Sequence, residues 1–239
     1  MLDINVRHRK LNIISCNHMP RRETISIGEY YHIYNRENYK QNLFLEERDW
    51  IRFLFLVLYL QSPINFENIG RHISYFVQHR RFNIPRDTKE NILKNRNVEL
   101  INFCLMPNHF HATIKEITEG GISKYLQRVQ IAYTKYLNIK HKKSGHIFQG
   151  SFRSVHIKDN EQLLHLSSYI HRNPREMSEW RNKEDQYFWS SYQDYIKENR
   201  WGELLKREII LDQFSNKKEY QDFIETSGTK LLLDENHLI

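Results

Sequence analysis

Two histidines separated by one residue, His109 and His111, are the sharpest candidates for chemistry in this sequence. Successive side chains of a β-strand point to opposite faces of the sheet, so the two imidazoles would share one face. Phe110 between them would face the other way and anchor the strand from behind. Two imidazoles on the polar face of a sheet can hold one metal ion. A chain with 13 histidines also places such pairs on its surface with no ligand, so the spacing alone leaves both interpretations open.

A second polar group consists of Tyr169 and Asn173, which stand four residues apart directly before Pro174. Residues four apart lie on one helix face, and the proline favours a helix end at Asn173, where the amide is able to turn outward. A tyrosine hydroxyl is a nucleophile in covalent catalysis. An amide oxygen beside two histidines suits a hard or borderline ion such as Mg²⁺ or Mn²⁺. The structural alternative is that Asn173 caps the helix and Tyr169 packs on the sheet.

The apolar pattern predicts the elements that would bring these two groups together. Four strands are expected: one within Thr24–Arg36, then Val98–Met106, His109–Glu116, and the end of Gly145–Lys158. The main helices are expected over Glu46–Leu60, Ile122–Ile139 and Asn160–Arg172, with shorter ones near 67–80, 87–94, Tyr187–Ile196 and Glu219–Thr226. This order is typical of an α+β fold with a ferredoxin-like antiparallel sheet and helices packed on one face.

The positive charge of the chain is concentrated in one stretch. Residues 120–159 hold eight Lys or Arg and a single acidic residue, an excess of seven that equals the formal net charge of the whole chain, +7. Five aromatic residues are interleaved with these charges: Tyr125, Tyr133, Tyr136, Phe148 and Phe152. A basic block with aromatic side chains suits a nucleic-acid partner, and the solvated surface of an ordinary basic protein is the alternative.

Cysteine usage and hydropathy indicate the compartment. Cys16 and Cys104 make neither a disulfide framework nor a zinc cluster, which favours a reducing cytosol. The longest apolar run, Phe53–Leu60, is far too short for a membrane span. Residues 1–18 lack the apolar core of a signal peptide, and Met19 is a candidate start. We therefore expect a cytoplasmic protein with no membrane partner, associated with the nucleoid if its partner is DNA.

Several short motifs, taken in order, resemble the single-tyrosine HUH transposases, in which HUH denotes His, a hydrophobic residue and His. Here that motif is His109-Phe110-His111. The chain is similar to the branch of REP-associated tyrosine transposases, whose domain is of the insertion-sequence-200 type. In that branch a Met-Pro-Asn-His-x-His run precedes a Tyr-Ile-x-x-Asn-Pro run. The matching stretches are Tyr30–Arg36, Cys104–His111, Gly145–Phe152, Tyr169–Pro174 and Trp189–Tyr192, within roughly residues 24–195.

The resemblance implies a role for each candidate residue. His109, His111 and Asn173 would bind a divalent metal ion, Mg²⁺ or Mn²⁺, and Tyr169 would be the nucleophile. The family cleaves and rejoins single-stranded DNA, often near a hairpin, through a covalent 5′-phosphotyrosine; it leaves a free 3′-hydroxyl and needs no nucleotide cofactor. Basic side chains would hold the DNA phosphates: Lys124, Arg128, Lys135, Lys142, Lys143, Arg153 and Arg172.

The resemblance also divides the chain into three parts. Residues 1–23 are expected to form a loosely ordered N-terminal arm, residues 24–196 the HUH transposase domain, and residues 197–239 a C-terminal helical extension. Residues 62–96 look like an insertion, because they are longer than the family usually needs at that place. The insertion and the tail both bear on DNA specificity rather than on the chemistry.

A tyrosine nucleophile needs assistance at neutral pH, because the pKa of a free phenol is about 10. A metal ion on a phosphate oxygen polarises the phosphorus and stabilises the leaving oxygen. A single tyrosine shared between cleavage and joining favours a homodimer with two sites. Should the nucleophile not be Tyr169, the next candidates are Tyr125, Tyr133 and Tyr136. Two other classes stay open: a domesticated, non-catalytic protein that binds hairpin DNA or RNA, and a metal-dependent hydrolase that uses a bound water.

Overall fold

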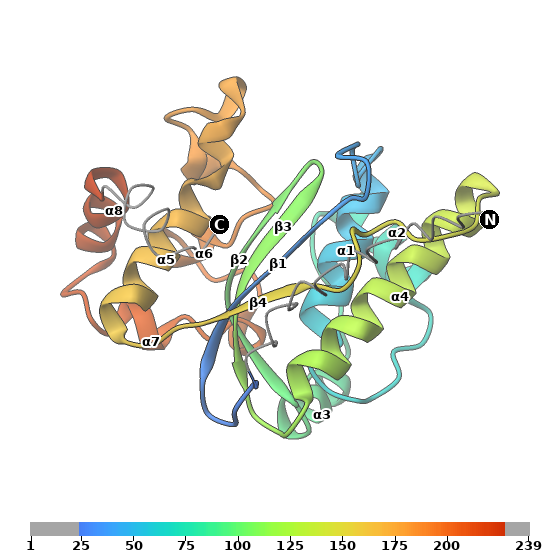
Figure 1. Cartoon of the computed structure of the whole chain (residues 1–239), viewed down its shortest axis with the longest axis horizontal. Helices are drawn as coiled ribbons and strands as arrows, with labels where there is room; N and C mark the ends of the chain where they lie inside the picture. Colours follow the sequence, from blue (N-terminus) through green and yellow to red (C-terminus); the bar gives the residue numbers. More distant parts are fainter. Residues whose placement is uncertain (1–23, 228–239) are drawn as a thin grey trace, which may run out of the picture.

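The sheet that carries both histidines has four strands. A computed structural model describes residues 24–227 of the 239-residue chain. Its strands are β1 (Tyr30–Arg36), β2 (Val98–Met106), β3 (His109–Glu116) and β4 (Arg153–His156). They are arranged in the order β2-β3-β1-β4, and all neighbouring pairs are antiparallel (Figure 1). The structure thus confirms the α+β class and the antiparallel sheet that the sequence predicted.

Eight α-helices occur in the described part of the chain. They are α1 (Glu47–Tyr59), α2 (Ile69–His79), α3 (Arg86–Lys94), α4 (Gly121–His141), α5 (Asn160–Arg172), α6 (Tyr192–Ile196), α7 (Glu208–Leu211) and α8 (Lys217–Thr226). Short 3-10 segments cover Asn173–Glu176, Ser178–Trp180, Glu184–Gln186 and Gly202–Leu204. The helix α6 is shorter than predicted, because Ser190 forms a bridge to Cys104 of β2 instead of a helical turn. Between residues 24 and 227, no helix is long and apolar enough to cross a bilayer.

Helices cover both faces of the sheet, whereas the sequence predicted one face. On β3, the Phe110 ring centroid lies 5.2 Å from that of Phe53 in α1, and the neighbouring His111 ring lies 5.4 Å from that of Tyr169 in α5. Neighbouring strand residues point to opposite faces, so α1 and α5 lie on opposite sides of the sheet, as Figure 1 shows.

The prediction of one covered face holds for α1 and α4, which pack together on the Phe110 side. It was wrong for α5, which packs against β2 and β3 on the other side. The physical reason lies in β2, whose residues are buried along nearly its whole length. The run Leu100–Met106 is apolar except for the buried Asn102, and such a run is typical of a strand that is buried on both faces.

Acidic side chains cap the N-termini of α4, behind the sheet, and of α5, on the face of the site. Glu116, the last residue of β3, accepts the backbone N–H groups of Gly121 and Ile122 at 2.9 and 2.6 Å. A negative charge is favourable at this end of α4, where the helix dipole is positive. Gly121 is required there, because a Cβ atom would lie 2.4 Å from the carbonyl oxygen of Asn97. The helix α5 begins in the same way, with Asp159 as its N-cap.

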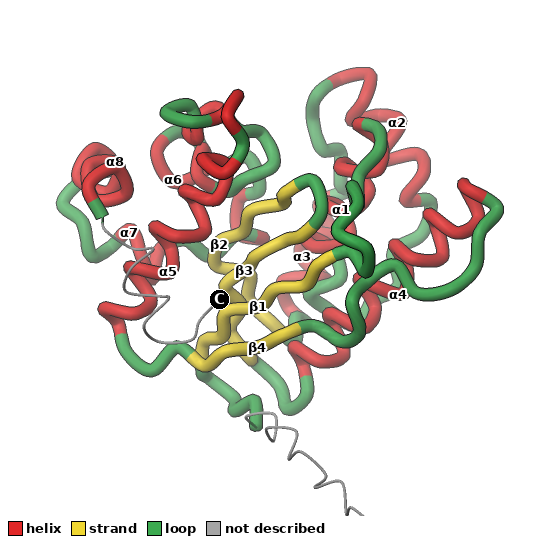
Figure 2. The backbone as a smooth tube through the Cα atoms, turned by 45° about the horizontal axis from the view of Figure 1, so that its top comes forward, coloured by secondary structure: helices red, strands yellow, loops and turns green. Residues whose placement is uncertain are grey.

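The expected insertion and the described part of the tail, residues 197–227, are both folded. Residues 62–96 contain α2 and α3 close to the predicted positions, and α2 packs against α1. In the tail, α8 packs against α5 and α6 (Figure 2). The three-part division of the chain itself stays a prediction. The N-terminal arm, with Cys16 and Met19, lies outside the described residues, and Cys104 is a buried free thiol.

Candidate active site

Polar side chains from three strands gather on one face of the sheet. In the antiparallel register, Tyr34 lies opposite His111 and Arg36 opposite His109. Opposed residues share a face, so β1 adds its own polar side chains to the face of the histidine pair. His109 and His111 are only 7% and 6% exposed, because α5 covers this part of the sheet. The pair is therefore a buried site and not a feature of the open surface.

Side chains on both sides hold the imidazole of His109. Its Nδ1 lies 2.6 Å from Oδ1 of Asn108, which acts as the acceptor because the Asn108 amide nitrogen donates to the carbonyl of Lys40. Its Nε2 lies 3.4 Å from Oδ1 of Asn173. With the ring proton on Nδ1, Nε2 carries a lone pair and faces a second lone-pair donor with no proton between them. A cation stabilises such an arrangement.

The imidazole of His111 is held by a third histidine. Its Nδ1 lies 2.9 Å from Nε2 of His32 in β1, and the two rings are stacked with centroids 5.1 Å apart. When Nδ1–H of His111 is the donor in this bond, its Nε2 is left with a lone pair. Hydrogen bonds of this kind fix the tautomer and the orientation of metal-binding histidines.

Both imidazoles are neutral at pH 7. Burial, followed by the positive charge of Arg36, lowers the pKa of His109 to about 4. Burial also brings the pKa of His111 well below its ordinary value, with further lowering by His32, His109 and Arg36. Neutral imidazole is the form that binds a metal ion.

The donor set fits a divalent ion. It consists of two imidazole nitrogens and the amide oxygen of Asn173, a mixture that suits a borderline ion such as Mn²⁺. Within residues 24–227, no group of three or more His, Cys, Asp or Glu side chains is arranged as a metal site. The set described here is of another type, because its third member is an amide. Metal binding stays a prediction.

Tyr169 lies next to the histidine pair, as the proposed chemistry requires. Its ring, half-buried on α5, meets the His111 ring edge-on at an interplanar angle of 87°, with centroids 5.4 Å apart. Asn173 follows one turn later, and its amide nitrogen lies 3.4 Å from the Tyr169 carbonyl oxygen. Asn173 thus ends the helix, as the structural alternative expects. It also faces His109, where a metal ligand would have to lie.

Tyr34 is a second tyrosine beside His111. Its ring stacks on the imidazole with centroids 5.6 Å apart. The tyrosines of α4 are placed differently, because α4 lies on the opposite face of the sheet. The hydroxyl groups of Tyr125 and Tyr133 donate to the carbonyls of Val57 and Leu43, and burial raises the pKa of both phenols.

A buried polar chain holds α5 in place. Nε2 of His171 lies 2.9 Å from Oγ of Ser191, and Nδ1 of His171 lies 2.7 Å from the hydroxyl of Tyr220 in α8. Ser191 Oγ in turn accepts the backbone N–H of Phe103 in β2 at 2.9 Å. The helix that carries Tyr169 is therefore tied both to the sheet and to α8.

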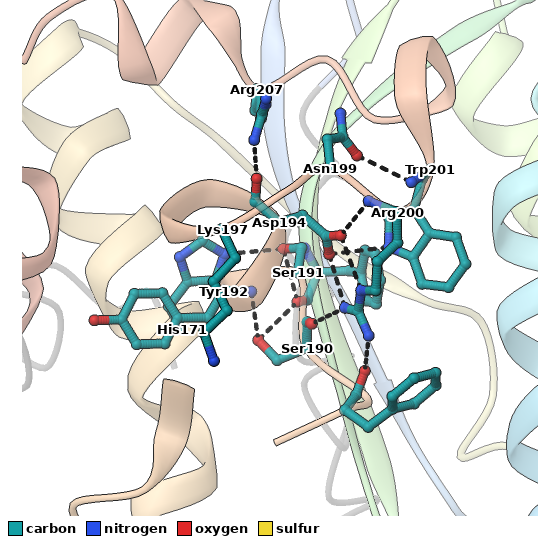
Figure 3. A network of polar contacts seen from close by, with 12 residues as sticks. His171, Ser190, Ser191, Tyr192, Asp194, Lys197, Asn199, Arg200, Trp201 and Arg207 are labelled. Carbon is teal, nitrogen blue, oxygen red and sulfur yellow. Dashed lines mark hydrogen bonds and ion pairs between the residues drawn. The ribbon is translucent and has the colours of Figure 1, made fainter. Parts of the chain in front are cut away.

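The segment around Ser191 is itself fixed by an ion pair between the buried Asp194 and the partly buried Arg200 (Figure 3). The Asp194 carboxylate accepts hydrogen bonds from the Arg200 guanidinium at 2.8 and 2.9 Å and from the Trp201 indole at 3.0 Å. Arg200 also donates to the carbonyl of Ser190 at 2.8 Å. Buried groups with this many partners form a rigid support.

The predicted DNA-binding side chains do not all reach this site. Arg153, the first residue of β4, lies opposite Tyr34 and shares the face of the histidines. The guanidinium of Arg128 donates to the carbonyls of Ser62 and Ile64, and that of Arg172 donates to the carbonyl of Ser227. Three lysine or arginine positions, Lys124, Arg128 and Lys135, belong to α4 on the far face of the sheet, and Lys142 and Lys143 follow α4 as exposed residues. Their role in DNA binding stays a prediction.

Sequence reasoning missed three residues that contact the histidine pair or face it. His32 and Asn108 orient the two imidazoles, and Arg36 brings a positive charge close to both. Alternation along β1 does place His32, Tyr34 and Arg36 on one face. The pairing of β1 with β3, which brings that face to the histidines, is a long-range contact with no signal in the local pattern.

Residues 73–173 match the family model described as "Transposase IS200 like". The matched range contains His109, His111, Tyr169 and Asn173. None of the curated proteins that were compared matches the chain. One solved structure, described as "Structure of the REP associates tyrosine transposase bound to a REP hairpin", is 16% identical over 74% of this chain and 83% of that chain, with a TM-score of 0.49.

Proposed function

Because residues 73–173 match the family model described as "Transposase IS200 like", we propose that the chain cleaves and rejoins single-stranded DNA through Tyr169. In this proposal, His109, His111 and Asn173 hold a divalent metal ion. The observation that carries it is the edge-on approach of the Tyr169 ring to His111, with centroids 5.4 Å apart. Nothing in the local sequence requires a tyrosine of α5 to lie beside a histidine of β3.

The chemistry is a transesterification at one phosphodiester. The phenolic oxygen of Tyr169 loses its proton and attacks the phosphorus, and a bond from tyrosine to phosphorus forms as the bond to the 3′-oxygen breaks. The leaving 3′-oxygen takes up a proton and becomes a free hydroxyl. A metal ion held by His109, His111 and Asn173 would polarise the phosphate and stabilise the charge on the leaving oxygen.

Rejoining is the reverse of cleavage. A 3′-hydroxyl attacks the phosphotyrosine, the new phosphodiester forms, and Tyr169 recovers its proton. The number of phosphate ester bonds is unchanged, so no nucleotide cofactor is needed. One tyrosine holds one DNA end at a time, and exchange between two cut ends therefore favours a homodimer with two copies of the site.

The proposal is tested with labelled single-stranded DNA hairpins that carry randomised flanks, incubated with the full chain and Mn²⁺. We expect a protein–DNA band that survives denaturation, and we expect Tyr169→Phe to abolish it while DNA binding persists. Tyr34→Phe is the matched control, since it removes the other hydroxyl beside His111 and keeps the stacked ring.

Three results would contradict the proposal in different ways. Binding with neither product nor adduct indicates a non-catalytic binding protein. Product without an adduct indicates a hydrolase that uses water. Equal adduct yields from the wild type and Tyr169→Phe would place the nucleophile elsewhere.

A further inference from the structure

The face that carries the histidine pair has a covered half and an accessible half. The helix α5 packs on β2 and β3, whose residues are buried almost throughout. On β1 and on the edge strand β4, side chains of the same face reach solvent: Tyr34 is half-buried, and Arg36 and Arg153 are exposed. The β4 edge is therefore the side from which a substrate strand would reach the histidines.

Arg36 and Arg153 are both neighbours of Tyr34 on this accessible half, Arg36 along β1 and Arg153 across from it on β4. Arg153 is opposite Tyr34, which is opposite His111, and Arg36 is opposite His109. Neighbouring strands are about 4.8 Å apart, so Arg153 starts about 10 Å from the His111 strand, and Arg36 starts about 5 Å from the His109 strand. Both side chains are long enough to meet a phosphodiester chain that runs toward the histidines.

Neither guanidinium has an acidic partner among the described residues. No ion pair of the 24–227 region involves Arg36 or Arg153. The carboxylate nearest to Arg36 along the chain is that of Glu37, and it accepts the backbone N–H groups of Tyr39 and Gln41. The two arginines thus differ from Arg128 and Arg172, whose donors are used within the protein.

The strand register places Arg36 beside the site. Arg36 lies directly opposite His109 in the β1–β3 pairing, on the face of the histidine pair, and its side chain is exposed. Guanidinium is planar and binds phosphate oxygens through two parallel hydrogen bonds. A phosphate beside Arg36 also lies within reach of the proposed metal ligands.

We infer that Arg36 and Arg153 form a phosphate-binding pair that guides single-stranded DNA over the β4 edge to the histidines. Arg36 binds the phosphate nearest His109, and Arg153 binds a phosphate farther along the strand. The inference rests on the proposed function for the identity of the DNA. The pair itself acts in binding and requires neither the metal ion nor the tyrosine.

The test separates binding from chemistry. In the Tyr169→Phe chain and in the presence of a chelator, affinity for a labelled single-stranded oligonucleotide is measured by fluorescence anisotropy across a series of salt concentrations. Each phosphate contact contributes about 0.7 to the slope of log K against log salt for single strands. Arg36→Ala and Arg153→Ala should each reduce the slope by about 0.7, and the double variant by about 1.4. At 0.15 M salt, each single change then weakens binding by about fourfold.

Two controls make the result specific. Arg81→Ala removes the same charge from an exposed residue after α2, outside the proposed path, and should leave the slope unchanged. Arg36→Lys keeps the charge and should keep the slope. Because all the substituted side chains are exposed, we expect thermal unfolding to show that every variant is still folded.

Three outcomes would contradict the proposal that Arg36 and Arg153 form a phosphate-binding pair. These are an unchanged slope in both arginine variants, an equal loss with Arg81→Ala, and no binding of single-stranded DNA by the parent chain. If the slopes fall as expected while the wild type forms no covalent adduct with Mn²⁺, the pair stands and the proposed cleavage does not. If adducts form and the slopes do not change, the cleavage stands and the pair does not.

Discussion

Replacing Asn108 with alanine tests whether His109 is held ready for a metal ion. The Asn108 side chain joins two parts of the site: its oxygen lies 2.6 Å from Nδ1 of His109, and its nitrogen donates to the Lys40 carbonyl at 3.2 Å. The alanine variant loses both contacts. The aspartate variant keeps an acceptor for His109 and loses only the donor to Lys40.

The expected magnitude follows from these two contacts. Loss of a group that orients a metal-binding histidine typically weakens metal affinity by about 10- to 100-fold. Because Asn108 is half-buried and solvent partly replaces the lost acceptor, we expect about 10-fold, which is roughly 1.4 kcal/mol. The lost bond to Lys40 should lower the free energy of unfolding by about 1 kcal/mol in both variants.

The assay is titration calorimetry with Mn²⁺ on chains that carry Tyr169→Phe, without DNA, followed by urea unfolding of the same samples. We expect Asn108→Ala to weaken Mn²⁺ binding and Asn108→Asp to bind at least as tightly as the parent. Equal affinities of the parent and the alanine variant would refute the reasoning, because His109 would then need no support. Equal weakening by alanine and aspartate would show that the contact with Lys40, and not the histidine, is what matters.

Three further predictions concern the supports of the site and the metal ion. Glu116→Ala leaves the N–H groups of Gly121 and Ile122 without their carboxylate, and urea unfolding should show a loss of about 3 kcal/mol; a loss below about 0.5 kcal/mol contradicts the capping role. Burial lowers the pKa of His171 to about 3, so its unfolded form binds the proton more tightly and stability is lost as pH falls below about 6.5. From pH 7 to pH 5 this residue should contribute a loss of about 2 kcal/mol, and His171→Gln should show a flatter dependence in unfolding experiments across that range. His111→Ala should abolish both adduct formation and the stabilisation by Mn²⁺ in thermal unfolding; cleavage that survives in a chelator would contradict the metal assignment.

The local pattern of the sequence was sufficient for the elements themselves. Alternation at His109-Phe110-His111 predicted a strand with both imidazoles on one face, and β3 has that arrangement. The spacing of Tyr169 and Asn173 before Pro174 predicted a helix that ends at the asparagine, as α5 does. These signals are local, because side-chain periodicity and proline act within one element.

The rest of the site depends on contacts between distant segments. His32 reaches His111 across 79 positions of the chain, and Asn108 joins His109 to the Lys40 carbonyl. Such contacts are set by strand register and loop packing, which periodicity does not encode. Arg128 of α4 shows the same dependence on distant contacts. Its charge suggested a phosphate ligand, but its guanidinium donates to the backbone carbonyls of Ser62 and Ile64.

The most direct test of the account is to locate the covalent bond. Single-stranded hairpin DNA is incubated with the full chain and Mn²⁺, nuclease and protease trim the adduct, and mass spectrometry reads the modified peptide. The account predicts a nucleotide on Tyr169 through a 5′-phosphate. A nucleotide on Tyr34, or cut DNA with no modified tyrosine, would contradict it.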